Sequence, residues 1–151
     1  MPVRILIVDD HAVVREGLKT ILEAEGNLKI VGEAGDGREA LEKAEELKPD
    51  VIFMDITMPD LSGIETTRLI LERLPAVRII ILSMHASNEY VIRAIRAGAR
   101  AYILKESAGC NAVYAVRAVL RGRQYFGEGV EAPQTKRSGT PLPYPSPPLP
   151  C

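Results

Sequence analysis

Five polar side chains stand at the ends of short apolar runs, and their types suit the transfer of a phosphoryl group. Asp9 and Asp10 follow the run ILIV, Asp55 follows VIFM, Ser83 follows IIIL and Lys105 follows AYIL. A carboxylate can attack phosphorus, and cations and hydrogen-bond donors must neutralise the charge on the transferred group. One such residue would signify little, because strands commonly end where the chain meets water. Together the five predict a phospho-acceptor site in which Asp55 is the acceptor and Ser83 and Lys105 contact the phosphoryl group.

The same carboxylates also predict a metal site. Three carboxylates brought close together repel one another, and they stay ionised only if a cation lies among them. Oxygen ligands favour a hard cation, so we expect Asp9, Asp10 and Asp55 to bind Mg²⁺ or Mn²⁺. The turn after Asp55 would bring the backbone carbonyl of Thr57 to the same ion. His11 follows the two aspartates, but we expect it to begin a helix and to face water rather than to bind metal.

Short apolar runs that alternate with helical patterns would position these side chains. The expected strands span residues 3–8, 28–32, 51–55, 77–83 and 101–104, and the expected helices span 11–25, 37–47, 62–73, 87–97 and 107–121. Several strands are nearly continuous Val, Ile and Leu, which is typical of strands covered on both faces. The pattern predicts a doubly wound (βα)5 α/β fold with a parallel five-stranded sheet. Sites in such folds lie at the carboxyl ends of the strands, where the five polar residues fall.

Four motifs in this order carry a family resemblance: ILIVDDH, VIFMDITMPDLSG, IIILSMH and GARAYILKES. Over residues 3–122 the chain resembles the receiver domain of bacterial two-component response regulators, which has a flavodoxin-like fold. Three segments are most similar to the NarL/FixJ (LuxR-type) group: DDHAVVREGL, AIRAGARAYILKE and AVRAVLRGRQYF. In that group the receiver usually precedes a helix-turn-helix domain that binds DNA, which implies a role in transcription regulation.

The resemblance implies a function for each site residue. A cognate histidine kinase would transfer a phosphoryl group to Asp55, with Mg²⁺ held by the acidic set, and Ser83 and Tyr102 would form a switch pair. Phosphorylation adds charge and acceptor oxygens at Asp55. Ser83 would move towards them, and Tyr102 would then turn inward and change the surface formed by the fourth helix, fifth strand and fifth helix. This surface would control homodimerisation or output. Such a domain catalyses only its own phosphorylation and dephosphorylation and is no enzyme in the ordinary sense.

Two other functions remain open at this stage. One is an aspartyl-phosphate hydrolase similar to the haloacid dehalogenases, which carry D-x-D-x-T/V after the first strand, where this chain has DDH. Turnover of phosphate esters would favour that hydrolase, whereas stoichiometric labelling would favour a receiver. The other is a receiver-like interaction module that never takes phosphate. The complete acidic set, together with Ser83 and Lys105, argues against that module.

The end of the chain differs in composition from the rest. Seven of the eleven prolines lie between Pro133 and Pro150, and only 19 residues follow Ala132. We expect a receiver domain at 1–125 and, at 126–151, a Pro-rich tail that is disordered or a truncated or non-native linker, without an output domain. With a formal net charge of −1, we expect no specific DNA binding by this chain. No apolar run is long enough for a signal or a membrane span, so we expect a cytoplasmic protein.

Overall fold

Parallel strands form one sheet in the order β2-β1-β3-β4-β5-β6 in the computed structural model, which describes residues 2–133. The strands are β1 (Val3–Val8), β2 (Leu28–Ala34), β3 (Val51–Asp55), β4 (Arg78–Ser83), β5 (Ala101–Leu104) and β6 (Tyr125–Phe126). The helices are α1 (Ala12–Glu23), α2 (Gly37–Leu47), α3 (Gly63–Arg73), α4 (Asn88–Ala97) and α5 (Ala108–Leu120), with a 3-10 turn η1 (Lys105–Ser107) before α5. The predicted alternation of strands and helices is confirmed.

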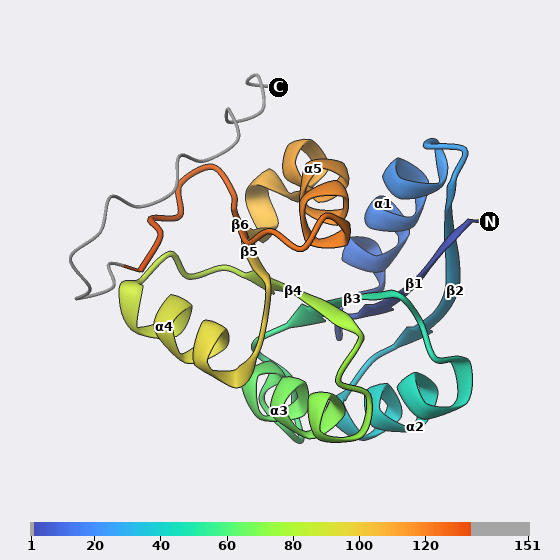
Figure 1. Cartoon of the computed structure of the whole chain (residues 1–151), viewed down its shortest axis with the longest axis horizontal. Helices are drawn as coiled ribbons and strands as arrows, with labels where there is room; N and C mark the ends of the chain where they lie inside the picture. The colour runs from blue at the N-terminus through green and yellow to red at the C-terminus, as the bar shows by residue number, and fades with distance from the viewer. Residues whose placement is uncertain (1, 134–151) are drawn as a thin grey trace.

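Helices cover both faces of the sheet, so the central strands are buried on both sides. Figure 1 shows α1 and α5 on one face and α2, α3 and α4 on the other. Successive side chains of a strand point to opposite faces. Accordingly Phe53 of β3 packs in the core on the α1 and α5 side, while its neighbours Ile52 and Met54 pack in the core against α2, α3 and α4. The apolar runs of β3, β4 and β5 and most of that of β1 are thus buried, and polar side chains follow at their carboxyl ends.

Local signals mark several helix ends. Ser62 caps α3, and its Oγ accepts a hydrogen bond from the backbone N–H of Glu65 at 3.1 Å. The carboxylate of Glu65 pairs with Arg68. Gly98 ends α4 with φ +111°, a conformation that glycine adopts without steric cost. Across residues 2–133, each helix is too short or too polar to cross a bilayer.

Within residues 2–133 the sheet has six strands, whereas the sequence predicted five. Tyr125 and Phe126 pair in parallel with Ala101 and Tyr102 of β5, and the backbone N–H of Gly127 donates to the carbonyl of Tyr102 at 3.0 Å. A strand of two residues is too short to produce a recognisable period, and it forms because β5 would otherwise leave an unpaired edge. The expected boundary between residues 125 and 126 therefore falls inside β6, and the expected tail from residue 134 onwards lies outside the described residues.

Candidate functional site

The site lies where the sheet reverses its strand order. Strand β1 lies between β2 and β3. The connection from β1 to β2 therefore runs towards one edge of the sheet, and the connection from β2 to β3 runs back towards the other edge. Val8 is opposite Met54 in the sheet register, and the next residue of each strand is an aspartate, Asp9 or Asp55. These two side chains are 0% and 2% exposed. The register of two parallel strands therefore sets two buried carboxylates side by side, as the sequence predicted.

Lys105 joins the two carboxylates. It follows β5 as the first residue of η1, and its side chain is only 12% exposed. Its Nζ lies 2.9 Å from Asp9 Oδ2 and 3.1 Å from Asp55 Oδ2. Both contacts have the short distances of charge-assisted ion pairs, and Lys105 is the partner of both Oδ2 atoms. One ammonium group thus faces two buried carboxylates, and the cluster keeps an excess of negative charge.

That excess affects the titration of Asp55. Burial, reinforced by the charge of Asp9, raises the pKa of Asp55 to about 6, although Lys105 and the backbone N–H of Thr57 oppose the rise. Burial lowers the pKa of Lys105, but its contacts with Asp9 and Asp55 overcome that effect and leave this pKa raised. The ionised form of Asp55 is therefore costly in the protein alone, and a further cation would stabilise it.

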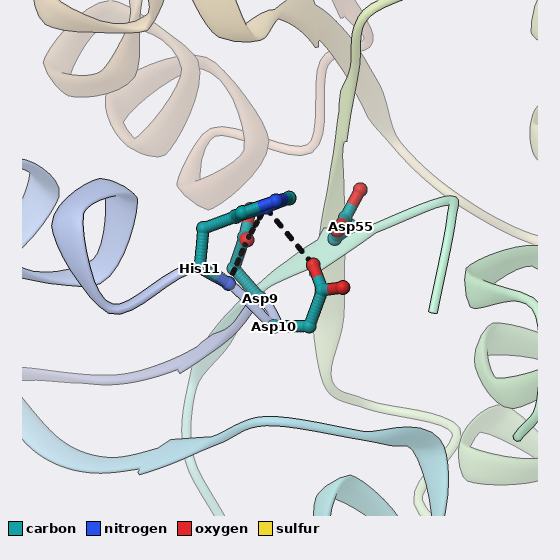
Figure 2. A group of neighbouring side chains, drawn as sticks. All are labelled: Asp9, Asp10, His11 and Asp55. Carbon is teal, nitrogen blue, oxygen red and sulfur yellow. Dashed lines mark hydrogen bonds and ion pairs between the residues drawn. The ribbon is translucent and has the colours of Figure 1, made fainter. Parts of the chain in front are cut away.

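Four side chains at this edge have the chemistry and spacing of a metal site. Asp9, Asp10, His11 and Asp55 can each offer one ligand atom, and these atoms lie within 4.8 Å of one another (Figure 2). The side chain of Asp10 is 30% exposed and opens the cluster to water. Apart from Lys105 the two buried Oδ2 atoms have no donor, and a further cation would offset the remaining negative charge. The backbone N–H of Thr57 donates to Asp55 Oδ1 at 3.2 Å, and metal binding by its carbonyl stays a prediction.

His11 lies at the rim of the cluster. It is the N-cap residue of α1, and its side chain is 61% exposed, so the expectation that it begins the helix and faces water is confirmed. Its ring nevertheless turns back over the aspartates, with Nδ1 3.2 Å from Asp9 Oδ1 and 3.0 Å from Asp10 Oδ1. Sequence analysis missed these contacts, because the pattern DDH leaves the direction of the ring open.

The predicted switch residues meet at one backbone carbonyl. Ser83 Oγ accepts a hydrogen bond from the His85 N–H at 2.9 Å and donates to the His85 carbonyl at 3.2 Å. The Tyr102 hydroxyl donates to the same carbonyl at 2.6 Å. Tyr102 is fully buried, whereas we expected it to turn inward only after phosphorylation. The ring packs in the core on the α2, α3 and α4 side, and the carbonyl of His85 satisfies its hydroxyl.

Two further residues position the site, and sequence analysis missed both. Asp60, in the turn after β3, accepts hydrogen bonds from the backbone N–H groups of Gly37 and Arg38 at 2.9 and 3.0 Å. The bond from Gly37 is the largest cause of the lowered pKa of Asp60. Arg15 of α1 donates to the carbonyl of Asp9 at 2.5 Å. The Asp60 contacts join segments 22 and 23 residues apart, whereas the Arg15 contact spans six residues, and no local pattern in the sequence indicates either.

Known proteins are similar to this chain in sequence. Residues 5–117 match the family model described as the response regulator receiver domain. The chain belongs to this family. The transcriptional regulatory protein DegU of Brevibacillus brevis is 41% identical over 124 residues, which cover 82% of this receiver chain and 52% of DegU. The response regulator VraR of Staphylococcus aureus is 40% identical over 126 residues, which cover 83% of this chain and 60% of VraR. The receiver chain thus spans about half to three-fifths of the length of these relatives.

Solved receiver structures agree with the fold. A LuxR-family two-component response regulator from Aurantimonas superposes with a TM-score of 0.79 at 39% identity, over 83% of this chain and 89% of that one. The isolated receiver domain of RcsB from Salmonella enterica serovar Typhimurium, in the presence of the phosphomimetic BeF3-, gives a TM-score of 0.79 at 25% identity, over 86% and 96% of the chains. The flavodoxin-like receiver fold and the similarity to the NarL/LuxR-type group are confirmed.

Proposed function

We propose that Asp55 accepts a phosphoryl group from the phosphohistidine of a cognate kinase, and that the receiver then changes its partners. The observation that carries this proposal is the buried pair of Asp9 and Asp55 with Lys105 between them, at distances of 2.9 and 3.1 Å from its Nζ. Asp55 ends a central strand and is held rigidly, as an in-line nucleophile must be. A mere structural ion pair would not need a second buried carboxylate at the same ammonium.

The chemistry follows from this arrangement. A carboxylate oxygen of Asp55 attacks phosphorus, the P–O bond forms, and the N–P bond breaks, so that the imidazole leaves with the electron pair. Lys105 lies close enough to offset charge on the phosphoryl oxygens. Asp9, Asp10, Asp55 and the carbonyl of Thr57 would hold Mg²⁺ or Mn²⁺, which supplies further positive charge when bound. In a separate hydrolysis step water attacks phosphorus, the bond between phosphorus and the Asp55 oxygen breaks, and inorganic phosphate is released with the Asp55 carboxylate regenerated, so the chain acts only on its own phosphoryl group.

The hydrogen bonds at His85 suggest how the signal leaves the site. Ser83 Oγ can donate either to the His85 carbonyl, as it does here, or to a phosphoryl oxygen on Asp55. The second arrangement would release the loop between β4 and α4, whose carbonyl also holds the Tyr102 hydroxyl. Ser83 and Tyr102 would thus act as a switch pair through the backbone of His85. The surface of α4, β5 and α5 lies next to this loop and would report the change.

We infer the partners from the family and the relatives. The phosphodonor is a histidine kinase, which acquires its phosphoryl group from ATP in the cytoplasm, so the receiver would work there. The phosphorylated surface would form a homodimer or control an output domain. DegU is named a transcriptional regulatory protein, and a longer protein that contains this receiver would regulate transcription in the same way.

Labelling by acetyl phosphate tests the acceptor directly. With Mg²⁺, intact-mass spectrometry should find one phosphoryl group on the wild-type chain and none on Asp55→Asn or on the wild-type chain in EDTA. Asp50→Asn is the matched control, because Asp50 lies before the amino end of the same strand and contacts the backbone N–H of Arg4. Labelling of Asp55→Asn at the wild-type rate would contradict the proposal. Release of many equivalents of phosphate per chain would identify a hydrolase instead.

A further inference from the structure

We infer that a basic patch at the amino ends of β4, β5 and β6 binds the phosphate backbone of duplex DNA without reading its sequence. The patch consists of Arg78, Arg100, Arg121 and Arg123. The inference rests on the proposed function insofar as this receiver belongs to a longer regulator of transcription, which would bring DNA within reach. It assigns a partner to the edge of the sheet opposite Asp55, which ends the parallel strand β3.

The register of the sheet brings the four arginines to one edge. Arg78 begins β4, and Arg100 immediately precedes β5. The backbone N–H of Arg100 donates to the carbonyl of the residue after Arg78 at 2.9 Å, and the carbonyl of Arg100 accepts from the Tyr125 N–H at 3.0 Å. Arg123 lies two residues before Tyr125, and Arg121 is the C-cap residue of α5. Because the three strands start side by side, the arginines form a row across them.

No carboxylate offsets the positive charge of the patch. In the described part of the chain none of its four guanidinium groups has a hydrogen bond or an ion pair, whereas Arg73 pairs with Glu45 and Arg117 pairs with Glu25. Asp and Glu do not occur in the segments that contain the patch, 73–88, 90–105 and 107–127. Like charges held together repel one another, so such a patch attracts an anionic partner.

A structural use accounts for only part of the patch. A cation near the carbonyl end of a helix interacts favourably with the helix dipole, and Arg121 at the end of α5 is placed for this. The effect is confined to the last turn of a helix, however, and Arg78 begins a strand. Asp50 precedes the neighbouring strand β3, but its carboxylate accepts from the Arg4 N–H at 2.9 Å. Helix dipoles therefore do not explain a row of cations that crosses three strands.

The residue type and the spacing of the row favour a phosphate backbone. All four residues are arginine, whose planar guanidinium fork binds two phosphate oxygens at once, whereas an ammonium group is a point charge. Neighbouring strands are about 4.8 Å apart, so the starts of β4 and β6 are separated by about 10 Å. Successive phosphates of one DNA strand rise by about 3.4 Å along the helix axis. The row therefore spans about three phosphates.

Binding through the backbone alone is weak, and a covalent link makes it effective. Contacts of this kind give dissociation constants of about 10⁻⁴–10⁻⁶ M at physiological salt. A receiver joined to a DNA-bound output domain would experience an effective DNA concentration in the millimolar range. The receiver would then lie against the duplex with Asp55 at the far end of the sheet, where it stays open to a kinase.

Fluorescence anisotropy of the full chain with a fluorescein-labelled duplex tests the inference, at salt concentrations from about 20 to 200 mM KCl. The patch variant combines Arg100→Gln, Arg121→Gln and Arg123→Gln, which removes the three exposed arginines of the row. Each phosphate contact contributes about 0.9 to the slope of log K against log salt, so this variant should flatten the slope by about 2.7. A second duplex of unrelated sequence should bind the wild-type chain equally well.

The matched control combines Lys29→Gln, Arg38→Gln and Lys48→Gln. These three cations are also exposed, lie on β2 and α2 or next to them, and form no ion pair in the described part of the chain. The control loses the same three positive charges as the patch variant, and both keep Lys136 and Arg137. It should retain the wild-type slope to within about 1, because its cations make no phosphate contact.

Labelling of Asp55 by acetyl phosphate separates this inference from the proposed function. The patch variant should take the label at the wild-type rate, which also shows that it folds. Equal flattening of the slope in both triple variants, or no binding of the duplex by the wild-type chain at the lowest salt, would overturn the inference. Binding to phosphatidylserine vesicles in preference to the duplex would also overturn it and assign the patch to a membrane. A wild-type chain that binds the duplex but takes no label would overturn the proposed phosphoryl transfer alone.

Discussion

Asp9 and Asp55 share one ammonium group, so the buried part of the site carries one more negative charge than positive charge. Desolvation is the main reason why the pKa of Asp55 rises to about 6 from its ordinary 3.8. A raised carboxyl pKa means that ionisation disfavours the folded state. The same excess charge makes the site ready for a cation and for the phosphoryl chemistry that needs one.

At the residue scale, the raised pKa of Asp55 predicts that Asp55→Asn stabilises the protein in EDTA. Above pH 6 the carboxyl is ionised in both folded and unfolded chains, and the shift from 3.8 to about 6 costs the folded state on the order of 3 kcal/mol. At pH 5 about half of this cost remains, and below the unfolded pKa it vanishes. Urea unfolding at pH 8 and pH 5 measures the difference between variant and wild type. Glu16→Gln, which changes an exposed carboxylate of α1, is the control and should have little effect.

At the scale of elements, the start of α3 is pressed against the end of β3. A Cβ on Gly63 would lie 1.9 Å from the carbonyl oxygen of Asp55, and the Gly63 N–H donates to the carbonyl of Ile56 at 2.7 Å. The helix can approach the acceptor turn this closely only because residue 63 has no side chain. Helix α3 and the turn after Asp55 therefore form one unit.

Gly63→Ala should consequently destabilise the chain by about 1–3 kcal/mol or more, because backbone atoms must move to admit the methyl group. Gly17→Ala is the matched control, since a Cβ on Gly17 in α1 would meet nothing within 4 Å. That change should stabilise the chain by about 0.5–1 kcal/mol. Urea unfolding of the two variants provides the measurement, and equal effects from both would refute the close packing at Gly63.

Helix α2 is tied to the acceptor turn by a second contact between elements. Asp60 accepts from the Gly37 and Arg38 N–H groups, whereas Asp36 accepts from Glu39 N–H at 2.8 Å. Two free amide groups at the start of α2 thus bond to the distant Asp60, and a third bonds to the neighbouring Asp36.

Asp60→Ala should speed amide hydrogen exchange at Gly37 and Arg38 while Glu39 stays protected. Asp36→Ala should have the reverse effect. Because the pKa of Asp60 is lowered by these bonds, its stabilisation is present above the unfolded pKa and is lost as pH falls through the folded value. Exchange measured by NMR at neutral pH resolves the three amides. If Glu39 lost protection as much as Gly37 in Asp60→Ala, the two contacts would not be independent.

At the scale of the whole molecule, β6 pairs with β5 at the edge of the sheet, and a buried hydrogen bond joins β6 to α5. The Tyr125 hydroxyl donates to Asn111 Oδ1 of α5 at 2.9 Å, and both residues are buried. Burial raises the pKa of Tyr125 to about 12, so the hydroxyl remains a donor throughout the neutral range. Residues 125–127 thus pack as part of the same sheet and core.

Tyr125→Phe should cost about 1–3 kcal/mol, because the buried Asn111 oxygen would lose its donor without gaining water. Tyr114→Phe is the control: Tyr114 is 47% exposed on α5, and its change should stay within about 0.5 kcal/mol. Denaturant unfolding of the full chain distinguishes the two. Similar small effects in both variants would mean that β6 contributes little to the stability of the fold.

The sequence by itself determined the alternation of strands and helices, the caps at Ser62 and Gly98, and the polar residues at the strand ends. Each of these depends on neighbours within a few residues, and parallel strands bring their carboxyl ends together whatever else the chain does. Tertiary structure decided the sixth strand, the inward position of Tyr102, the hydrogen bonds of Asp60 and the direction of the His11 ring. The first three depend on partners 17 to 24 residues away. The His11 ring is placed by the tight turn at the end of β1, which only the folded backbone defines.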